Sequence, residues 1–242
     1  MTLKGSKIVV VGGSSGIGRG VAAAAVDRGA EVVLVGRSRD KLQDASQALG
    51  GPPAVEAIAA DVTHEDEVAR MFARVGPFDH LVITRGTPPV AAPIAAFDLD
   101  QVRAFVDTML VSAISLAKHA HGTLRSGGSL TFTSGISKDR PPVPGGAVVA
   151  AVAGSFGYLA RALALELAPT RVNVVSPGWV DTPMWDTLVG EGKTAMWEEM
   201  SHRLPAGRIA SPADIAPAYL FLMESELTTG TVLAIDGGHA LI

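Results

Sequence analysis

A glycine-rich turn placed directly after the first apolar run constrains the fold of this chain more than any other feature. Residues 8–11 form a short β-branched run, the sequence Gly12-Gly13-Ser14-Ser15-Gly16-Ile17-Gly18 follows, and a helical stretch covers residues 21–27. Glycines at this spacing let a helix pack close to a strand, and free N–H groups at the helix start can bind a pyrophosphate. The pattern favours a dinucleotide site over an ordinary turn.

The rest of the chain alternates between β-branched runs and amphipathic stretches. The predicted strands cover residues 8–11, 31–35, 55–60, 80–84, 129–134, 171–176 and 231–235. Predicted helices include residues 99–121, 147–167 and a segment that begins at Pro212 and is capped by Ser211. Strands that alternate with helices pair in parallel through right-handed crossovers. We therefore expect an α/β fold, a Rossmann-type doubly wound parallel sheet of about seven strands with helices on both faces.

The composition agrees with this fold class. Hydrophobic residues make up 48% of the 242 residues and aromatic residues only 5%, so the core must consist mainly of Ala, Val, Leu and Ile. The length suits one domain, which we expect to span residues 1–242. One excursion, residues 179–207, carries Trp179, Trp185, Trp197 and several methionines, and we interpret it as an apolar lid or a subunit contact.

Several classes of function are disfavoured. The net charge of -4, with both signs scattered along the chain, leaves no basic patch for nucleic acid. The chain has no cysteine, and its histidines show no metal-binding spacing, so we expect no metal. The first apolar run is too short for a signal peptide or a membrane span. We expect a cytoplasmic protein with no membrane partner.

The motif Gly12-x-x-x-Gly16-Ile17-Gly18 resembles that of the short-chain dehydrogenase/reductase family. Further similarities run along essentially the whole chain, including Pro177-Gly178 with Thr182 and the C-terminal Asp236-Gly237-Gly238. The resemblance implies a small-molecule substrate and a homo-oligomer, a dimer or a tetramer. The expected cofactor site comprises Gly12, Ser14, Ser15, Gly16, Ile17, Gly18, Arg37, Asp61, Val62, Gly86, Pro177, Gly178 and Thr182.

Arg37 bears on which nicotinamide cofactor binds. It stands at the end of the second predicted strand, where a carboxylate would bond the ribose 2′-hydroxyl and repel a 2′-phosphate. A guanidinium at this position can bind the phosphate through a bidentate hydrogen bond. The residue therefore favours NADP(H) over NAD(H), unless Arg37 is simply a solvated residue at the start of the next helix.

The family's usual catalytic Tyr and Lys are missing. By resemblance, Val149 occupies the Tyr position and Ala153 the Lys position, and neither side chain can donate a proton. Ser134 and Ser137 are the remaining catalytic candidates, although either could do no more than cap a loop. Tyr158 lies about 13 Å farther along the helix, and we interpret it as a core or interface residue.

Three functions remain open. The first is an NADP(H)-dependent oxidoreductase acting on a carbonyl or alcohol, with an atypical proton source such as Ser134, Ser137, Lys138 or water. The second is an inactive NADP(H)-binding sensor or a partner subunit of an active relative. The third is a non-redox dehydratase or isomerase that uses Arg85 or Asp139, where Arg85 faces either the crevice or solvent.

Overall fold

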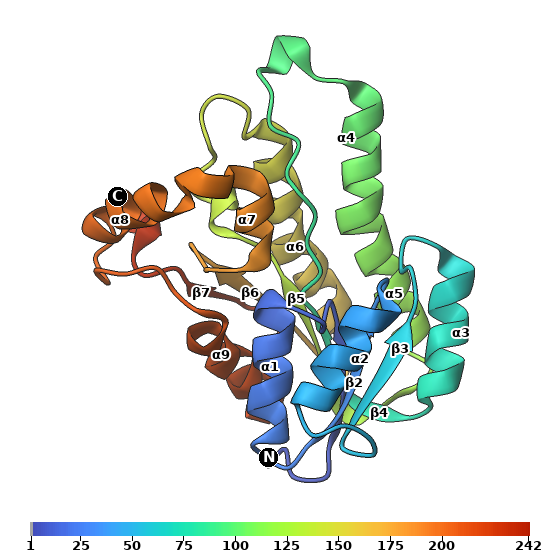
Figure 1. Cartoon of the computed structure of the whole chain (residues 1–242). Helices are drawn as coiled ribbons and strands as arrows, with labels where there is room; N and C mark the ends of the chain where they lie inside the picture. The colour runs from blue at the N-terminus through green and yellow to red at the C-terminus, as the bar shows by residue number, and fades with distance from the viewer. Residues whose placement is uncertain (1) are drawn as a thin grey trace.

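The computed structural model describes residues 2–242, which form a seven-stranded parallel sheet in the order β3-β2-β1-β4-β5-β6-β7 (Figure 1). The strands are β1 (Lys7–Val11), β2 (Glu31–Gly36), β3 (Val55–Ala59), β4 (Phe78–Ile83), β5 (Leu124–Thr133), β6 (Arg171–Pro177) and β7 (Val232–Ile235). The predicted fold class is confirmed. The largest difference in a strand is β5, which begins at Leu124 instead of residue 129.

Helices cover both faces of the sheet. They are α1 (Gly16–Val26), α2 (Arg39–Ala48), α3 (Glu65–Val75), α4 (Leu99–Val106), α5 (Ser112–Ala120), α6 (Ala147–Glu166), α7 (Pro183–Val189), α8 (Lys193–Arg203) and α9 (Pro212–Glu224). Because side chains alternate along a strand, Ile8 and Val10 of β1 pack with α1, α2 and α9. Val9 and Val11 pack on the opposite face with α3, α5 and α6. The sheet is thus buried on both sides.

The strand order reverses between β1 and β4. From β1 the chain continues outward to β2 and β3, and it then returns to place β4 on the other side of β1. The crossovers after β1 and β4 therefore leave in opposite directions, and this opens a crevice at the carboxyl ends of the two strands. Thr84, which follows β4, closes the bottom of this crevice because its N–H and its hydroxyl both donate to the Val11 carbonyl, at 2.9 and 3.0 Å.

The helix predicted for residues 99–121 is interrupted by a π-turn. Residues Asp107–Val111 form this turn between α4 and α5. The Arg85 guanidinium, from the loop after β4, donates to the Thr108 carbonyl within the turn and to the Ser112 hydroxyl. The widened turn and the arginine are therefore one local structure, and single π-turns of this kind are frequent at functional sites.

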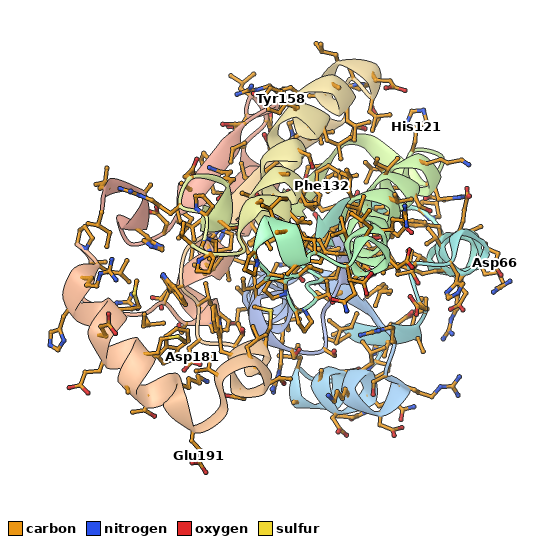
Figure 2. The ribbon with its side chains drawn as sticks, turned by 90° about the horizontal axis from the view of Figure 1, so that it is seen from above. Asp66, His121, Phe132, Tyr158, Asp181 and Glu191 are labelled. Carbon is orange, nitrogen blue, oxygen red and sulfur yellow. The ribbon has the colours of Figure 1, made fainter. Side chains whose placement is uncertain are left out.

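Helix α6 buries only a narrow stripe. Among residues 2–242 it is the one helix long and apolar enough to cross a membrane, judged by length and composition alone, and 17% of its most apolar window is buried. Val152, Phe156 and Ala160 face the core. Tyr158 is 75% exposed, with Arg161 over its ring, and Figure 2 shows it on the outer side of the helix. Of the two alternatives predicted for Tyr158, the core is therefore excluded, and a place in an interface stays a prediction.

Candidate functional site

A cavity of about 890 Å³ lies at the carboxyl ends of β1 and β4, within the range of roughly 300–1,000 Å³ common for ligand pockets. It runs from the glycine turn, past the ends of β4, β5 and β6, to α7 and the C-terminal segment. The proposed cofactor residues that line it are Gly12, Ser14, Ser15, Gly16, Ile17, Arg37, Asp61, Val62, Gly86, Pro177, Gly178 and Thr182. Gly18 is the one member of the expected set that does not line the cavity.

Gly18 instead allows the turn to close beneath the cavity. A Cβ atom at this position would lie 2.3 Å from the Gly12 carbonyl oxygen and 2.4 Å from the Thr84 hydroxyl oxygen. Gly12 has φ +86°, and a Cβ there would lie 2.8 Å from the Arg85 backbone nitrogen. The spaces that side chains would fill are therefore occupied by the backbone of the turn and of the loop after β4.

The start of α1 faces the cavity without a negative charge of its own. Residues 16–19, which form the first turn of α1, carry no acidic side chain. The Ser15 side chain makes no capping hydrogen bond. The orphan N–H groups and the positive end of the helix dipole therefore suit a phosphate group. Thr182 approaches from the loop after β6, since a Cβ on Gly16 would lie 3.2 Å from its methyl carbon.

The end of β2 forms a cationic wall. Arg37, Ser38 and Lys41 line the cavity there, and Asp61 faces them from the end of β3. Burial opposes ionisation of Asp61, but hydrogen bonds from the Thr63 hydroxyl and N–H, together with the charge of Arg37, hold the pKa of Asp61 below its ordinary value. Asp61 is therefore an ionised acceptor. These features fit a nicotinamide dinucleotide: a glycine cradle, an uncapped helix start, a cationic wall and one carboxylate.

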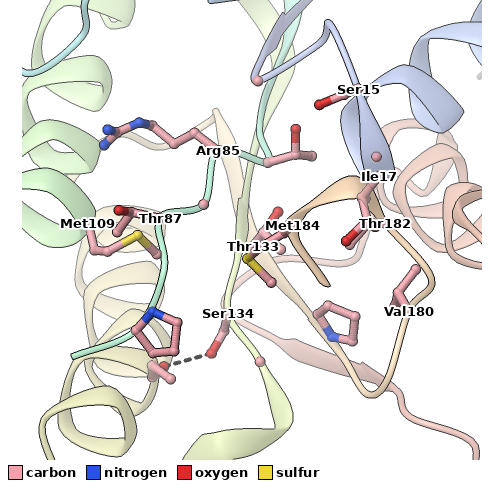
Figure 3. Close-up of a pocket in the computed structure, with 18 of the residues that line it drawn as sticks. Ser15, Ile17, Arg85, Thr87, Met109, Thr133, Ser134, Val180, Thr182 and Met184 are labelled. Carbon is pink, nitrogen blue, oxygen red and sulfur yellow. Dashed lines mark hydrogen bonds between the residues drawn. The ribbon is translucent and has the colours of Figure 1, made fainter. Parts of the chain in front are cut away.

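Within residues 2–242, the cavity wall opposite the nucleotide side has no phenol or ammonium group. Val149 and Ala153 of α6, which were assigned to the Tyr and Lys positions by resemblance, both line the cavity. The Ser134 hydroxyl donates to the Ala153 carbonyl at 2.7 Å (Figure 3). Ser137 also lines the cavity, on the short 3₁₀ turn Ile136–Lys138. The structure therefore brings both serine candidates to the cavity but commits the Ser134 proton to the backbone.

The chain's two tyrosines lie elsewhere. Tyr158 is on the outer side of α6, whereas Tyr219 is fully buried in α9 with its hydroxyl 2.6 Å from that of Thr133. Burial raises the pKa of Tyr219 well above its ordinary value, and the Thr133 hydrogen bond only partly offsets this. Neither phenol is placed to protonate a ligand in the cavity.

Arg85 lines the cavity, but its guanidinium turns toward the π-turn (Figure 3). Burial lowers the pKa of Arg85, with Asp61 opposing and Arg37 adding to the effect. Asp139, the other candidate for non-redox chemistry, pairs with Lys138. Neither Asp139 nor Lys138 is among the residues that line the cavity within the described part of the chain.

The segment 179–207 contains α7, and α7 closes one end of the cavity. Trp179, Met184 and Trp185 line the cavity, and a Cβ on Gly86 would lie 4.0 Å from the Met184 sulfur across the crevice. Lys193 of α8 bridges Asp181 and Asp186, each at 2.6 Å, and so ties α8 to the base of α7.

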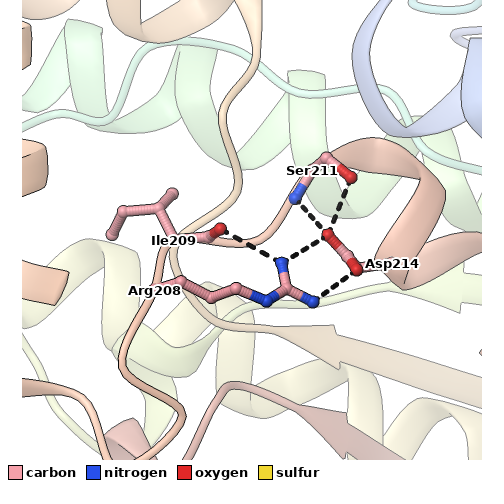
Figure 4. A network of polar contacts seen from close by, with 4 residues as sticks. All are labelled: Arg208, Ile209, Ser211 and Asp214. Atoms are coloured by element: carbon pink, nitrogen blue, oxygen red, sulfur yellow. Dashed lines mark hydrogen bonds and ion pairs between the residues drawn. The ribbon is translucent and has the colours of Figure 1, made fainter.

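A network of polar contacts joins the end of this segment to the start of α9. Arg208 binds both carboxylate oxygens of Asp214, and Asp214 also accepts from the N–H and hydroxyl of Ser211 at 2.7 Å (Figure 4). Ser211 and Asp214 form the capping box of α9, which confirms the helix start predicted at Ser211-Pro212. The Arg208 side chain holds the loop that follows the segment against the start of α9.

Sequence reasoning did not place several other residues in the cavity. Arg140 and His239 line its outer end, and Phe105, Met109 and Phe156 line it from α4, the π-turn and α6. Burial lowers the pKa of His239; Asp236 opposes this, while Arg140 and Arg203 add to it. No local motif marks these residues, because the cavity joins elements more than a hundred residues apart. Among residues 2–242, no group of three or more His, Cys, Asp or Glu side chains could hold a metal ion.

Comparisons with known proteins agree with this geometry. The family model described as enoyl-(acyl carrier protein) reductase matches residues 11–240. The short-chain dehydrogenase/reductase malC of Malbranchea aurantiaca is 33% identical, with 99% of this chain and 96% of the relative covered. Its structure, described as a reductase/Diels-Alderase, superposes with a TM-score of 0.93 at 29% identity, covering 100% of this chain and 98% of that one.

Two NADPH-bound structures are also similar. A small-chain dehydrogenase in complex with NADPH has a TM-score of 0.82 at 31% identity, covering 99% and 100% of the two chains. A short-chain oxidoreductase from Pseudomonas aeruginosa PAO1, described as NADPH-bound and as containing an atypical catalytic center, has a TM-score of 0.87 at 25% identity. That match covers 97% of this chain and 96% of the other.

Proposed function

Because this chain belongs to the short-chain dehydrogenase/reductase family, we propose that it is an NADP(H)-dependent oxidoreductase of a small carbonyl or alcohol with an atypical proton source. The observation that carries the proposal is the cavity at the strand-order reversal, with a glycine cradle at one end and an apolar wall at the other. The NADPH-bound structural relatives support the nucleotide assignment. The cofactor, when bound, supplies or accepts the hydride.

The preference for NADP(H) rests on the end of β2. Arg37 and Lys41 would bind the 2′-phosphate, and Ser38 would add a hydroxyl. The nearby carboxylate, Asp61, projects from the end of β3 and would accept from the adenine or ribose. Gly12, Gly16 and the start of α1 would hold the pyrophosphate, while Thr182 would hold the nicotinamide end.

The proton path differs from the family's usual arrangement. Because Ser134 Oγ donates to the Ala153 carbonyl, its lone pairs can accept a hydrogen bond from substrate or water, but its proton is not free. Ser137 is the remaining serine at the cavity, and we assign to its hydroxyl the transfer of a proton from water to the substrate oxygen. An unperturbed serine is a weak acid, so turnover of ordinary carbonyls should be about 10²- to 10⁴-fold below that of a relative with a positioned general acid.

The side chains of α6 also fit a second function, the binding of NADP(H) by an inactive sensor or partner subunit. The apolar pair Val149 and Ala153 suits a chain that binds NADP(H) without turnover, as a sensor or a partner subunit. The outer face of α6 is uncovered, with Tyr158 and Leu165 mostly exposed, and this supports assembly into a homo-oligomer, a dimer or a tetramer. In either function we propose that residues 1–242 act as one domain, with the segment 179–207 as its lid.

The test is a parallel titration with NADPH and NADH that follows energy transfer from tryptophan to the reduced nicotinamide. Trp179 and Trp185 line the cavity, so the signal originates beside the site. We expect NADPH to bind at least about tenfold more tightly, because charge-assisted hydrogen bonds contribute about 1.5–3 kcal/mol. Arg37→Asp should abolish this preference. Arg39→Asp is the matched control, since Arg39 does not line the cavity within residues 2–242.

Turnover then separates the functions. NADPH consumption with a carbonyl, reduced by Ser137→Ala, would support the oxidoreductase. Tight NADPH binding without turnover across a broad substrate panel would favour the sensor or partner subunit. Failure of both nucleotides to bind would contradict the proposal.

A further inference from the structure

All three tryptophans of the chain form one cluster. Ring centroids of Trp179 and Trp185 are 4.8 Å apart, and Trp197 contacts both of them edge-on, at 5.6 and 5.2 Å. His239, which follows β7, lies 5.9 Å from Trp179. These rings come from the loop after β6, from α7, from α8 and from the C-terminal segment, so the cluster exists only in the folded chain.

The members of the cluster differ in what they face. Trp179, Trp185 and His239 line the cavity, whereas Trp197 lies behind them and is not among the lining residues of the described chain. Trp197 meets the other two indoles at interplanar angles of 81° and 69°. It therefore backs the two lining rings and restricts their movement, which leaves a rigid aromatic surface toward the cavity.

The cluster has no room for a ligand within it. Centroid separations of 4.8–5.6 Å are those of rings in direct contact, so a guest can meet only the surface that faces the cavity. The cluster is therefore not a cage that surrounds an organic cation, as the cages that recognise quaternary ammonium groups do. The surroundings also disfavour a cation, because Arg140 lines the same end of the cavity.

Much of the remaining wall at this end is apolar and includes two flexible methionines. Phe105, Met109 and Phe156 line the cavity from α4, the π-turn and α6, and Met184 and Leu188 line it from α7. Among the lining residues within 2–242, Asp61 is the only carboxylate, and it lies at the nucleotide end near Arg37. Methionine and aromatic side chains interact favourably with the edges and faces of aromatic rings.

We propose that the substrate end of the cavity binds a planar aromatic ring system, uncharged or anionic, which stacks on the surface formed by Trp179 and Trp185. The proposal deepens the oxidoreductase function and rests on it, because it names the class of substrate that this site selects. A saturated substrate of the same shape would bury similar area but lose the ring–ring interaction. Arg140 and His239 lie beside the surface and accommodate an acceptor or negative group on the ring.

The test compares two matched ketones by calorimetry, 2-acetylnaphthalene and its fully saturated counterpart 2-acetyldecalin. The protein is titrated once saturated with NADP⁺, which prevents reduction, and once without nucleotide. We expect the naphthyl ketone to bind about five- to tenfold more tightly, from the typical strength of ring–ring interactions beyond area burial. The preference for the naphthyl ketone is measured with and without nucleotide. If NADP⁺ does not bind, the proposed function is contradicted, but the measurement without nucleotide still tests the aromatic surface.

Variants assign the preference to the surface. Trp185→Leu should reduce it to about twofold or less, and Trp185→Phe should restore most of it. Trp197→Leu also removes an indole from the cluster, but this indole does not line the cavity. The Trp197→Leu variant should therefore keep most of the preference for the naphthyl ketone. Far-ultraviolet circular dichroism and NADP⁺ affinity check that each variant folds.

Three outcomes would overturn the proposal. Equal affinity of the two ketones for the wild-type protein is the first. The second is a preference that Trp197→Leu reduces as much as Trp185→Leu does, since the effect would then come from the stability of the segment. Tighter binding of (2-naphthyl)trimethylammonium than of 2-acetylnaphthalene is the third, because the surface would then be selecting a cation.

Discussion

The crevice has two sides, a nucleotide side at the glycine turn and a substrate side near α6, α7 and the C-terminal segment. The two sides differ in what determines their shape. On the nucleotide side, a Cβ atom on Gly12 or Gly18 would lie 2.8 Å or less from backbone atoms. On the substrate side, a Cβ on Gly135 would find its nearest neighbour, the Ser137 hydroxyl, at 3.8 Å. One side is shaped by backbone segments in contact, and the other by side chains that α6, α7 and the C-terminal segment contribute. The first should tolerate almost no substitution, whereas the second can change its chemistry while the fold persists.

The largest effect is expected from a change in the chemistry of the substrate side. The double variant Val149→Tyr/Ala153→Lys should raise kcat for reduction of a simple ketone by about 10²-fold or more, because a positioned general acid contributes 10²- to 10⁴-fold. Steady-state NADPH oxidation measures the change. Ala147→Tyr/Ala151→Lys places the same pair on the exposed side of α6 and should have no effect. A double variant that binds NADPH but gains no rate would break the assignment of these two positions.

A matched pair of glycine variants tests the rigidity of each side. Gly18→Ala should lower the free energy of unfolding by about 3 kcal/mol, because the new methyl group overlaps the Gly12 carbonyl and the Thr84 hydroxyl. It should also weaken NADPH binding. Gly135→Ala, which has extended backbone and open space, should change stability by less than about 0.5 kcal/mol. Chemical denaturation gives both values, and equal losses would refute the contrast between the two sides.

Acidification tests the sheet that both sides share. His80 of β4 is 3% exposed, and its ring nitrogen lies 2.9 Å from the Ser129 hydroxyl. Burial, with a smaller contribution from Arg171, lowers the pKa of His80 to about 4, while Asp79 opposes the shift. The unfolded chain therefore binds this proton more readily than the folded chain between pH 6.5 and 4, so stability falls as the pH falls through that window.

Between pH 7 and pH 5 the loss from this one group should be about 2 kcal/mol. Denaturation curves at several pH values measure it. His80→Gln should flatten the pH dependence in this window even if the variant is less stable at pH 7. An unchanged slope in His80→Gln would assign the pH dependence to other groups.

The smallest expected effect concerns the segment 179–207 alone. Lys193→Met removes the bridges to Asp181 and Asp186, and these raise the pKa of Lys193 through hydrogen bonds and charge. Because exposed ion pairs are weak, KM for the carbonyl substrate should rise only about threefold, with NADPH affinity unchanged. Lys118→Met breaks a more exposed ion pair with Glu65, away from the cavity, and should leave both constants unchanged. A large change in NADPH affinity would show that the segment also shapes the nucleotide side.

The same contrast explains what the sequence could and could not predict. Glycines and β-branched runs carry local information, so the turn at Gly12 and the strands were predictable, most of them to within two residues. The π-turn was not, because it depends on Arg85, which reaches it from the loop after β4. His239 and Arg140 join the substrate side through tertiary contacts that leave no periodic signal. The tryptophans of the segment marked it as apolar, but the sequence did not indicate that they pack on one another.

The hydrogen bond between Ser134 and the Ala153 carbonyl has a mechanical consequence. Its acceptor belongs to the backbone of α6, so the direction of the Ser134 hydroxyl follows the position of the whole helix and not the identity of residue 153. The outer side of the same helix is largely uncovered. Any contact that shifts α6 along its axis by a fraction of an ångström would be transmitted to one hydroxyl in the cavity, and the surface of the molecule would thereby influence the polarity of its interior.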